Sequence, residues 1–415
     1  MKKRIFSVIG MCILYSNSQA QIINDTVTTA PTYANNIWYS LANDDQASNA
    51  INTWHIGFAT VMGATDALTT SVLFNHKMGT VYEVPNSDPS DFANVDTTGF
   101  SAWTPLYNSD ESWAKGAFNN TVNLGAFDYG WGNYNMTTHG IDANRVFVIK
   151  LTAGGFYKLM INSTNPASTY TLVFDALDNT DLTTETIDVT AYTSKNFVYY
   201  NLSTKVIVDR EPVSENWDLY FHQYPSFDYD PPYMVTGIFQ NVGVEVAKAY
   251  PIDDVFSYED FSSESFNNTI STIGYDWKSF NGMSFEVVDS TVYFVSDQSG
   301  DVWKMIMTGF EGSSSGKYLF SKEKISTIGL SESDALCVSV YPNPASETAT
   351  IVLKNAPEAT IEVYTMTGDR VQMQHADASV LTAVSLNTAD LANGVYQVLI
   401  STATSATSQK LIIQH

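Results

Sequence analysis

Short runs of alternating apolar and polar residues dominate this chain, and Gly, Asn, Pro and Ser separate one run from the next. Hardly any stretch keeps apolar residues at the three- and four-residue spacing of a helix over several turns. Tyr, Thr, Val and other residues that suit a pleated, half-buried surface are frequent. The pattern therefore predicts an all-β protein built from antiparallel sheets.

The same order of runs occurs twice between about residues 33 and 325. Three segments pair at a constant offset of 146, and earlier segments pair at an offset near 163. The pairs are Trp131 with Trp277, 145–150 with 291–296, 154–161 with 300–307, and Trp54 with Trp217. The change of offset indicates an insertion in the first copy near 85–130, which is rich in aromatic residues. A repeat of this length predicts a duplicated domain.

The pattern thus predicts two tandem antiparallel β-sandwich-like domains, at 21–185 and 186–330, and a small C-terminal β-sandwich at 331–415. The last part has its own series of alternating runs. Pro342 and Pro344 restrict its first run to a sheet edge, Gly368 marks a hairpin turn, and Asn393-Gly394 begins a further strand.

The first twenty residues have the pattern of a secretory signal peptide. Lys2, Lys3 and Arg4 precede an apolar run over 5–15, and small residues place the expected cleavage between Ala20 and Gln21. No later apolar run is long enough for a transmembrane helix. After cleavage only Cys337 remains, so an internal disulfide is not expected.

Composition narrows the range of partners. The formal net charge is −24 and 13% of the residues are aromatic. Such an acidic chain would be repelled by phosphates, which argues against a nucleic-acid partner. Acidity also keeps an exported protein in solution, so it identifies no ligand.

The C-terminal segment resembles the type A sorting domain of the type IX secretion system of Bacteroidota. The resemblance rests on Tyr341-Pro342-Asn343-Pro344, the turn at Gly368, the strand that begins at Gly394, and the apolar ending at 411–413. It implies export by the Sec pathway and then by the type IX machinery, which would be a partner. The expected location is the medium or the outer-membrane surface.

The duplicated part resembles the HmuY-like family of secreted β-proteins. The carriers are 217–221 with its counterpart 54–58, the segment 131–139, and 145–161. Known members bind haem between two axial His or Met side chains within aromatic walls, so the resemblance implies haem or another flat hydrophobic ligand.

The candidate ligand-binding residues follow from that resemblance. They are His139, Met136, Trp131 and Tyr134, together with His76, which with Met78 is a nearby donor that could stand in for the family's other ligand. Residues 80–135, where the family has its other ligand, contain neither His nor Met. The second copy has Phe285 opposite His139 and Gly282 opposite Met136. His55 takes the place of an Asp and is expected to be structural, and His222 is expected to face solvent.

No motif predicts an enzyme. Gly312-Ser-Ser314-Ser-Gly316 has the letters of a nucleophile elbow, but strands flank it where a strand-to-helix turn is required. Paired carboxylates occur without the spacing of an EF-hand loop. We therefore expect a non-catalytic binding protein without a structural metal. The alternative is a surface adhesion or interaction module that binds no cofactor.

Overall fold

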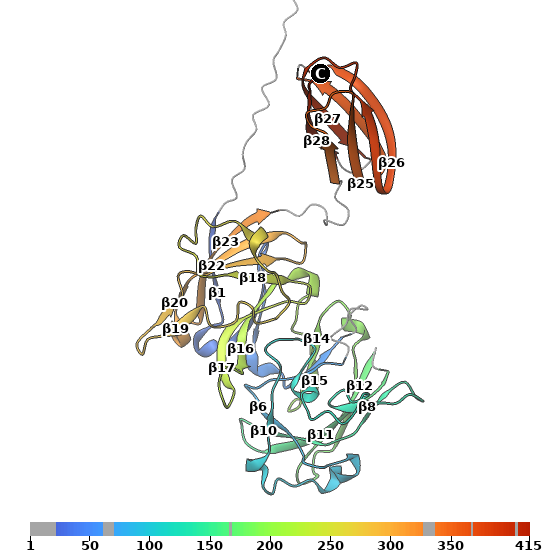
Figure 1. Ribbon diagram of the computed structural model, residues 1–415. Helices are drawn as coiled ribbons and strands as arrows, with labels where there is room; N and C mark the ends of the chain where they lie inside the picture. Colours follow the sequence, from blue (N-terminus) through green and yellow to red (C-terminus); the bar gives the residue numbers. More distant parts are fainter. Residues whose placement is uncertain (1–21, 61–69, 166–167, 327–336, 367, 403–405) are drawn as a thin grey trace, which may run out of the picture. The chain divides into compact units, whose positions relative to one another are not determined.

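Figure 1 shows the computed structural model, which describes residues 22–60, 70–165, 168–326, 337–366, 368–402 and 406–415. The predicted signal peptide and its cleavage site at Ala20 and Gln21 lie outside these residues. The chain divides into two compact units, residues 1–327 and 328–415. Nearly all regular structure is β, which confirms the predicted fold class. Among the described residues, no helix is long and apolar enough to cross a membrane.

The first sandwich of the N-terminal unit consists of two antiparallel sheets. The inner sheet has the order β15-β14-β4-β5, and the outer sheet has the order β13-β12-β11-β10-β6-β7, with β8 and β9 attached. Its strands are β4 (Ile56–Ala59), β5 (Val72–Phe74), β6 (Gly79–Glu83), β7 (Pro105–Leu106), β8 (Gly132–Tyr134), β9 (Ile141–Ala143), β10 (Phe147–Leu151), β11 (Phe156–Asn165), β12 (Thr169–Ala176), β13 (Thr183–Asp188), β14 (Phe197–Asn201) and β15 (Val206–Val208).

The second sandwich repeats this plan. Its inner sheet has the order β3-β2-β16-β17, its outer sheet has the order β1-β23-β22-β21-β18, and β19 and β20 form a separate hairpin. Its strands are β1 (Ile23–Thr28), β2 (Asn35–Ser40), β3 (Asp44–Ala50), β16 (Leu219–Ser226), β17 (Tyr233–Gln240), β18 (Glu245–Ala249), β19 (Lys278–Phe280), β20 (Phe285–Val287), β21 (Val292–Ser296), β22 (Val302–Phe310) and β23 (Lys317–Ser326).

Side-chain bonds repeat together with the strands. The Asn75 Nδ2 donates to the carbonyls of Ile51 at 2.6 Å and Trp54 at 2.9 Å. The Asn241 Nδ2 donates to the carbonyls of Ser214 at 2.8 Å and Trp217 at 2.7 Å. Each Asn fastens the turn before a Trp-led strand to the end of the neighbouring strand. The structural repeat therefore follows the sequence repeat down to single bonds.

The two copies exchange their first three strands. β1, β2 and β3 belong to the first copy in sequence, but β1 pairs with β23 and β2 pairs with β16 of the second copy. β14, from the second copy, pairs with β4 of the first. The predicted division at 185/186 therefore does not coincide with the boundary between the sandwiches. The first sandwich is one continuous stretch, and the second is assembled from both ends of the unit.

The inner sheets are apolar on both faces. In β14, Val198 and Tyr200 point into the first core, whereas Phe197 and Tyr199 belong to a second cluster on the opposite face. In the other sandwich, Tyr220 lies in a corresponding cluster on the outward face of its inner sheet. Both faces of these strands are therefore buried, which explains continuous apolar runs such as FVYY and LYF. One face lies in a sandwich core and the other lies between the sandwiches.

The C-terminal unit is a five-stranded antiparallel sheet folded around one core. Its order is β24-β25-β27-β28, and β26 pairs along β25. Both halves of β25 supply buried residues to the same cluster, with register shifts between Lys354 and Ala359 where the strand bends. As predicted, the turn between β25 and β26 contains Gly368 at φ +90°, and β27 begins at Gly394. The strands are β24 (Cys337–Tyr341), β25 (Thr348–Thr365), β26 (Arg370–Asn387), β27 (Gly394–Ser401) and β28 (Ala406–Ile413).

Candidate functional site

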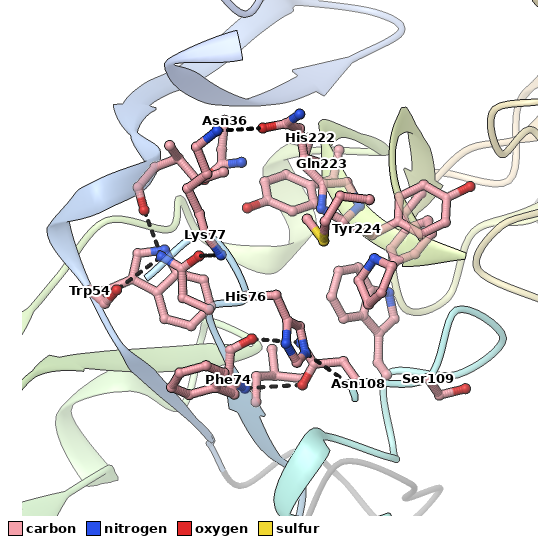
Figure 2. Close-up of a pocket in the computed structure, with 18 of the residues that line it drawn as sticks. Asn36, Trp54, Phe74, His76, Lys77, Asn108, Ser109, His222, Gln223 and Tyr224 are labelled. Carbon is pink, nitrogen blue, oxygen red and sulfur yellow. Dashed lines mark hydrogen bonds between the residues drawn. The ribbon is translucent and has the colours of Figure 1, made fainter. Parts of the chain in front are cut away.

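A cavity of about 60 Å³ lies where the two sandwiches of the N-terminal unit meet. Figure 2 shows side chains converging on it from the β5–β6 turn, from β16 and from the loop around Asn108. Seven aromatic side chains supply much of the wall: Trp54, Phe74, Trp113, Tyr199, Tyr220, Tyr224 and Phe239. Amides and hydroxyls supply the rest. An apolar wall with a few polar groups is the usual composition of a small-molecule site.

Trp113 joins the two sandwiches beside the cavity. This residue comes from the insertion of the first copy, and its ring centroid lies 5.8 Å from that of Phe197 and 5.6 Å from that of Phe239. Its Nε1 donates to the Gln240 carbonyl at 2.9 Å. The insertion therefore contributes a wedge between the inner sheets. Other aromatic residues of the insertion differ, since Phe118 is buried in the first core and Phe127 is exposed.

His76 is fixed in its neutral form at the edge of the cavity. Its Nε2 accepts the backbone N–H of Asn108 at 3.2 Å, so that nitrogen carries no proton. Asn108 in turn exchanges two hydrogen bonds with the backbone of Phe74. Burial lowers the pKa of His76 to about 3. His76 is the one predicted ligand-binding residue that lines this cavity.

His222 is buried, which corrects the prediction that it faces solvent. It is 9% exposed on β16, stacked on Tyr220 with ring centroids 4.3 Å apart, and edge-on to Phe239 at 4.4 Å. Burial lowers its pKa to about 3. The prediction failed because the outward face of an inner strand is covered by the other sandwich, which local sequence does not reveal.

Two polar atoms of the cavity wall have no hydrogen-bond partner within the described part of the chain. They are Nε2 of His222 and Nε1 of Trp54, and both residues line the cavity. A buried polar atom without a partner costs roughly 1–3 kcal/mol. A ligand with matching groups would offset that cost.

The other predicted ligand-binding residues lie outside the cavity lining. Trp131 is fully buried in the first core, and its Nε1 donates to the Thr70 carbonyl at 2.7 Å. Met136 and His139 are exposed beside the hairpin of β8 and β9, with Met136 at 69%. The His139 Nδ1 is hydrogen-bonded to the Tyr134 hydroxyl at 2.8 Å. The structure therefore does not bring His139 and Met136 together with His76.

These residues do not fit haem. Trp131 cannot serve as a wall because it is buried in the core, and the Nδ1 of His139 is already paired. The cavity beside His76 and His222 is several times smaller than the roughly 300–1,000 Å³ of drug-sized ligand sites. A porphyrin would have to part the two sandwiches to enter it.

His55 makes a structural bond, at the position where the second copy has Asp218. The Leu202 N–H donates to Nδ1 of His55 at 3.2 Å, and the Leu41 N–H donates to Oδ2 of Asp218 at 2.7 Å. Burial lowers the pKa of His55 to about 4, so it accepts this bond as a neutral ring. An imidazole and a carboxylate thus perform the same task in the two copies.

The sequence 312–316 forms a turn between β22 and β23, with a single 3-10 turn over Gly312–Ser314. The Ser314 hydroxyl donates to the Glu311 carbonyl at 2.8 Å, as in an ordinary loop. Within the described ranges, no group of three or more His, Cys, Asp or Glu side chains is placed to hold a metal ion.

The sorting motif of the C-terminal unit is bonded to the last strand. The Asn343 Nδ2 donates to the Lys410 carbonyl at 2.7 Å, and its Oδ1 accepts the Ile412 N–H at 2.8 Å. Ala345 exchanges backbone bonds with Ile412 and Gln414. Asn343, which follows Tyr341 and Pro342 in the motif, and Ala345 just after the motif therefore fix the C-terminal strand in place.

Comparison with known proteins identifies the family of the C-terminal unit of the chain. No curated protein matches the chain. Among solved structures it is similar to dimeric latent PorU from Porphyromonas gingivalis, with 15% identity over 59% of this chain and 26% of that chain. The TM-score is 0.19, a value that carries no argument, and the match spans about a quarter of that structure. Residues 339–414 match the family described as the secretion system C-terminal sorting domain. The protein is therefore exported by type IX secretion, to the cell surface or beyond it.

Proposed function

We propose that this exported protein is a non-catalytic binding protein that holds a small, flat, hydrophobic ligand in the cavity between its sandwiches. The observation that carries the proposal is the aromatic cavity whose wall includes two unpartnered polar atoms, on Trp54 and His222. The resemblance to HmuY-like domains points to the same class of ligand, although the residues here do not fit haem itself.

The chemistry of the cavity favours binding over catalysis. Its two histidines have pKa values near 3 because burial disfavours the charged ring. A general acid or base works best when its pKa lies near the operating pH. His76 and His222 therefore remain neutral at physiological pH and act as hydrogen-bonding and stacking groups.

Filling the cavity tests the proposal. Met234 lines the cavity and is partly exposed, so Met234→Trp should occupy the space without unfolding the core. We expect it to reduce the affinity for a naphthalene-type probe by at least tenfold, measured by quenching of tryptophan fluorescence and by calorimetry. Met136→Trp, on the exposed hairpin, is the matched control and should leave the affinity unchanged.

The earlier candidate residues provide the contrary outcome. If His139→Ala with Met136→Ala abolished binding of the probe or of hemin, and Met234→Trp did not, the ligand site would lie on the hairpin. Failure of every flat probe to bind the wild-type protein would contradict the proposal as a whole.

One surface feature favours the alternative function, an adhesion or interaction module. Phe227, Tyr229 and Tyr233 are exposed at the turn between β16 and β17. The Tyr229 and Tyr233 rings lie 5.6 Å apart. Exposed aromatic side chains in one place are typical of interaction sites. If their joint replacement by Ser reduced binding to host or bacterial surfaces while Met234→Trp did not, adhesion would be the better description.

A further inference from the structure

The cavity is positive in a strongly acidic protein. The chain has 44 Asp and Glu against 20 Lys and Arg, yet none of the described Asp and Glu residues lines the cavity. Its ionisable lining residues, apart from tyrosines, are His76, His222 and Lys77. Because both histidines are neutral, Lys77 is the one charged group in the lining as far as the structure describes the chain.

Lys77 stands at the mouth, and no acidic partner lies beside it within the described ranges. Its side chain is exposed, its Nζ lies 3.5 Å from Oε1 of Gln223, and no ion pair involves it among the residues that the structure describes. Figure 2 shows Lys77, Asn36 and Gln223 together at one end of the cavity, with Ser109 at the other end. One end of the cavity therefore carries an ammonium group that donates to Gln223 and has no carboxylate partner among the described residues.

A second cation lies directly behind this end. Arg210 is 5% exposed, and its Nη2 donates to Oδ1 of Asn36 at 3.0 Å. Its guanidinium lies 5.6 Å from the Trp54 ring centroid and 5.5 Å from that of Tyr199. Asn36, Trp54 and Tyr199 all line the cavity, so a single layer of side chains separates Arg210 from it.

The charge of Arg210 is poorly neutralised. It forms no ion pair within the described residues, and its Nε and Nη1 have no partner there. The neighbouring Glu211 instead accepts from the Tyr199 hydroxyl at 2.8 Å and the Asn196 N–H at 2.9 Å. Burial raises the pKa of Glu211 to about 7, which reduces its negative charge near neutral pH. Away from bulk water, the field of an unpaired guanidinium extends farther.

The end of the cavity away from Lys77 lies beside acidic residues. A separate groove shares Tyr224 with the cavity and is lined by Asp110, Glu111, Asp228 and Asp276. Burial, aided by Glu111 and Asp228, raises the pKa of Asp110. An anion would be repelled from that side, so the electrostatic potential is negative at the Tyr224 end of the cavity and positive at the Lys77 end.

We propose that the ligand carries a carboxylate, which lies at Lys77 and Asn36 while its flat apolar body packs against the aromatic walls. This inference rests on the proposed function and specifies the charge of the ligand. Since Oδ1 of Asn36 accepts from Arg210, its amide nitrogen is left as a donor. Because Lys77 stands at the mouth, the carboxylate lies there, and the edge of the ring enters the free volume of about 60 Å³, which corresponds to about two water molecules.

Benzoate, benzamide and benzylamine test the charge, because they share one ring and differ in the end group. For the wild-type protein, we expect benzoate to bind at least tenfold more tightly than benzamide, and benzylamine not to bind. The readouts are calorimetry and quenching of tryptophan fluorescence, since Trp54 and Trp113 both line the cavity.

Substitution of Lys77 locates the charge. Lys77→Gln should weaken benzoate binding by about tenfold and leave benzamide unchanged, whereas Lys77→Arg should retain it. Lys77 is exposed, so equal melting temperatures of the variants would show that the fold is intact.

The outcomes separate the two proposals. Equal binding of benzoate and benzamide, with no effect of Lys77→Gln, would overturn the carboxylate and leave the flat-ligand site standing. If neither the three benzene derivatives nor any naphthalene-type probe bound to the protein, both the ligand site and the carboxylate would be overturned.

Discussion

The two sandwiches share one strand order but differ in how the chain builds them. The first is continuous from β4 to β15, whereas the second takes β1 to β3 from the beginning of the unit and β16 to β23 from its end. The difference shows that a sequence copy and a folded sandwich need not contain the same strands. Each copy gives its first three strands to the other, as in a strand-exchanged dimer fused into one chain.

The largest expected effect comes from removing residues 22–50. β2 lies between β3 and β16, and Val27, Ile37 and Tyr39 belong to the second core. Their loss should cost more than the roughly 5–15 kcal/mol that stabilises a typical domain, so the second sandwich should not fold. The first sandwich should keep its near-ultraviolet circular dichroism and its resistance to protease. Cooperative folding of both sandwiches after the deletion would contradict the exchange.

A circular permutant provides the control. Ile23 pairs with Lys322, so the start of β1 lies beside the end of β23 and a short glycine-rich linker can join them. A chain running from 51 to 326 and then from 22 to 50 should fold, with a melting temperature within a few degrees of the parent N-terminal unit. A permutant that stays unfolded would show that the native connection from Ala50 to Ile51 is required.

A middle-sized effect should come from the two matching asparagines. Asn75→Ala and Asn241→Ala each leave two buried carbonyls without a donor, which should lower the free energy of unfolding by about 2–3 kcal/mol. Asn241→Ala should cost more, because its Oδ1 accepts both the Asn196 amide at 2.6 Å and the Val242 N–H at 2.7 Å, whereas Oδ1 of Asn75 accepts the Lys77 N–H at 3.1 Å. Denaturant unfolding measures both, with exposed Asn43→Ala as the control. A negligible cost for either variant would break the equivalence of the copies.

The smallest effect concerns pH. The folded-state pKa of His55 is lowered to about 4 from an ordinary 6.5, so its contribution to stability is present above pH 6.5 and is lost as the pH falls through 4. At pH 4.5 the loss from this residue should be about 2 kcal/mol. His55→Asp, which copies Asp218, should remove that loss.

Denaturant unfolding at pH 7 and pH 4.5 measures the effect of His55→Asp, with exposed His139→Asp as the control substitution. An equal decrease of stability with pH in wild type and in His55→Asp would show that His55 is not the titrating group.

Local sequence predicted the strands well because alternation and turns are local properties. The paired segments at 145–150 and 291–296 became β10 and β21, and Gly368 and Gly394 lie at the predicted turn and strand start. The exchange of strands could not be predicted in this way. β2 would pair equally well with β4 or with β16 as far as its own residues show, because the choice depends on the short connection over 51–55.

The site was harder to predict than the fold. His76 was identified as a candidate, but Lys77 and His222 were not, because they come together with Trp113 only when two outward faces pack against each other. Trp131 was predicted to bind ligand but is buried in the first core, because a Trp in a motif can fill a core as readily as a ligand site. One available signal was the inserted aromatic stretch itself, which the second copy lacks and which supplies the wedge at Trp113.

The pairing of β1 with β23 determines how late in synthesis the edge of β1 can be covered. The segment that leaves the ribosome first, just after the predicted leader, must wait for almost the last strand of its unit before its edge is covered. Only residues 327–338 then separate β23 from the sorting domain match. A chain cut short before β23 would therefore lack its export address and would also expose an unpaired strand, which quality-control proteases can recognise.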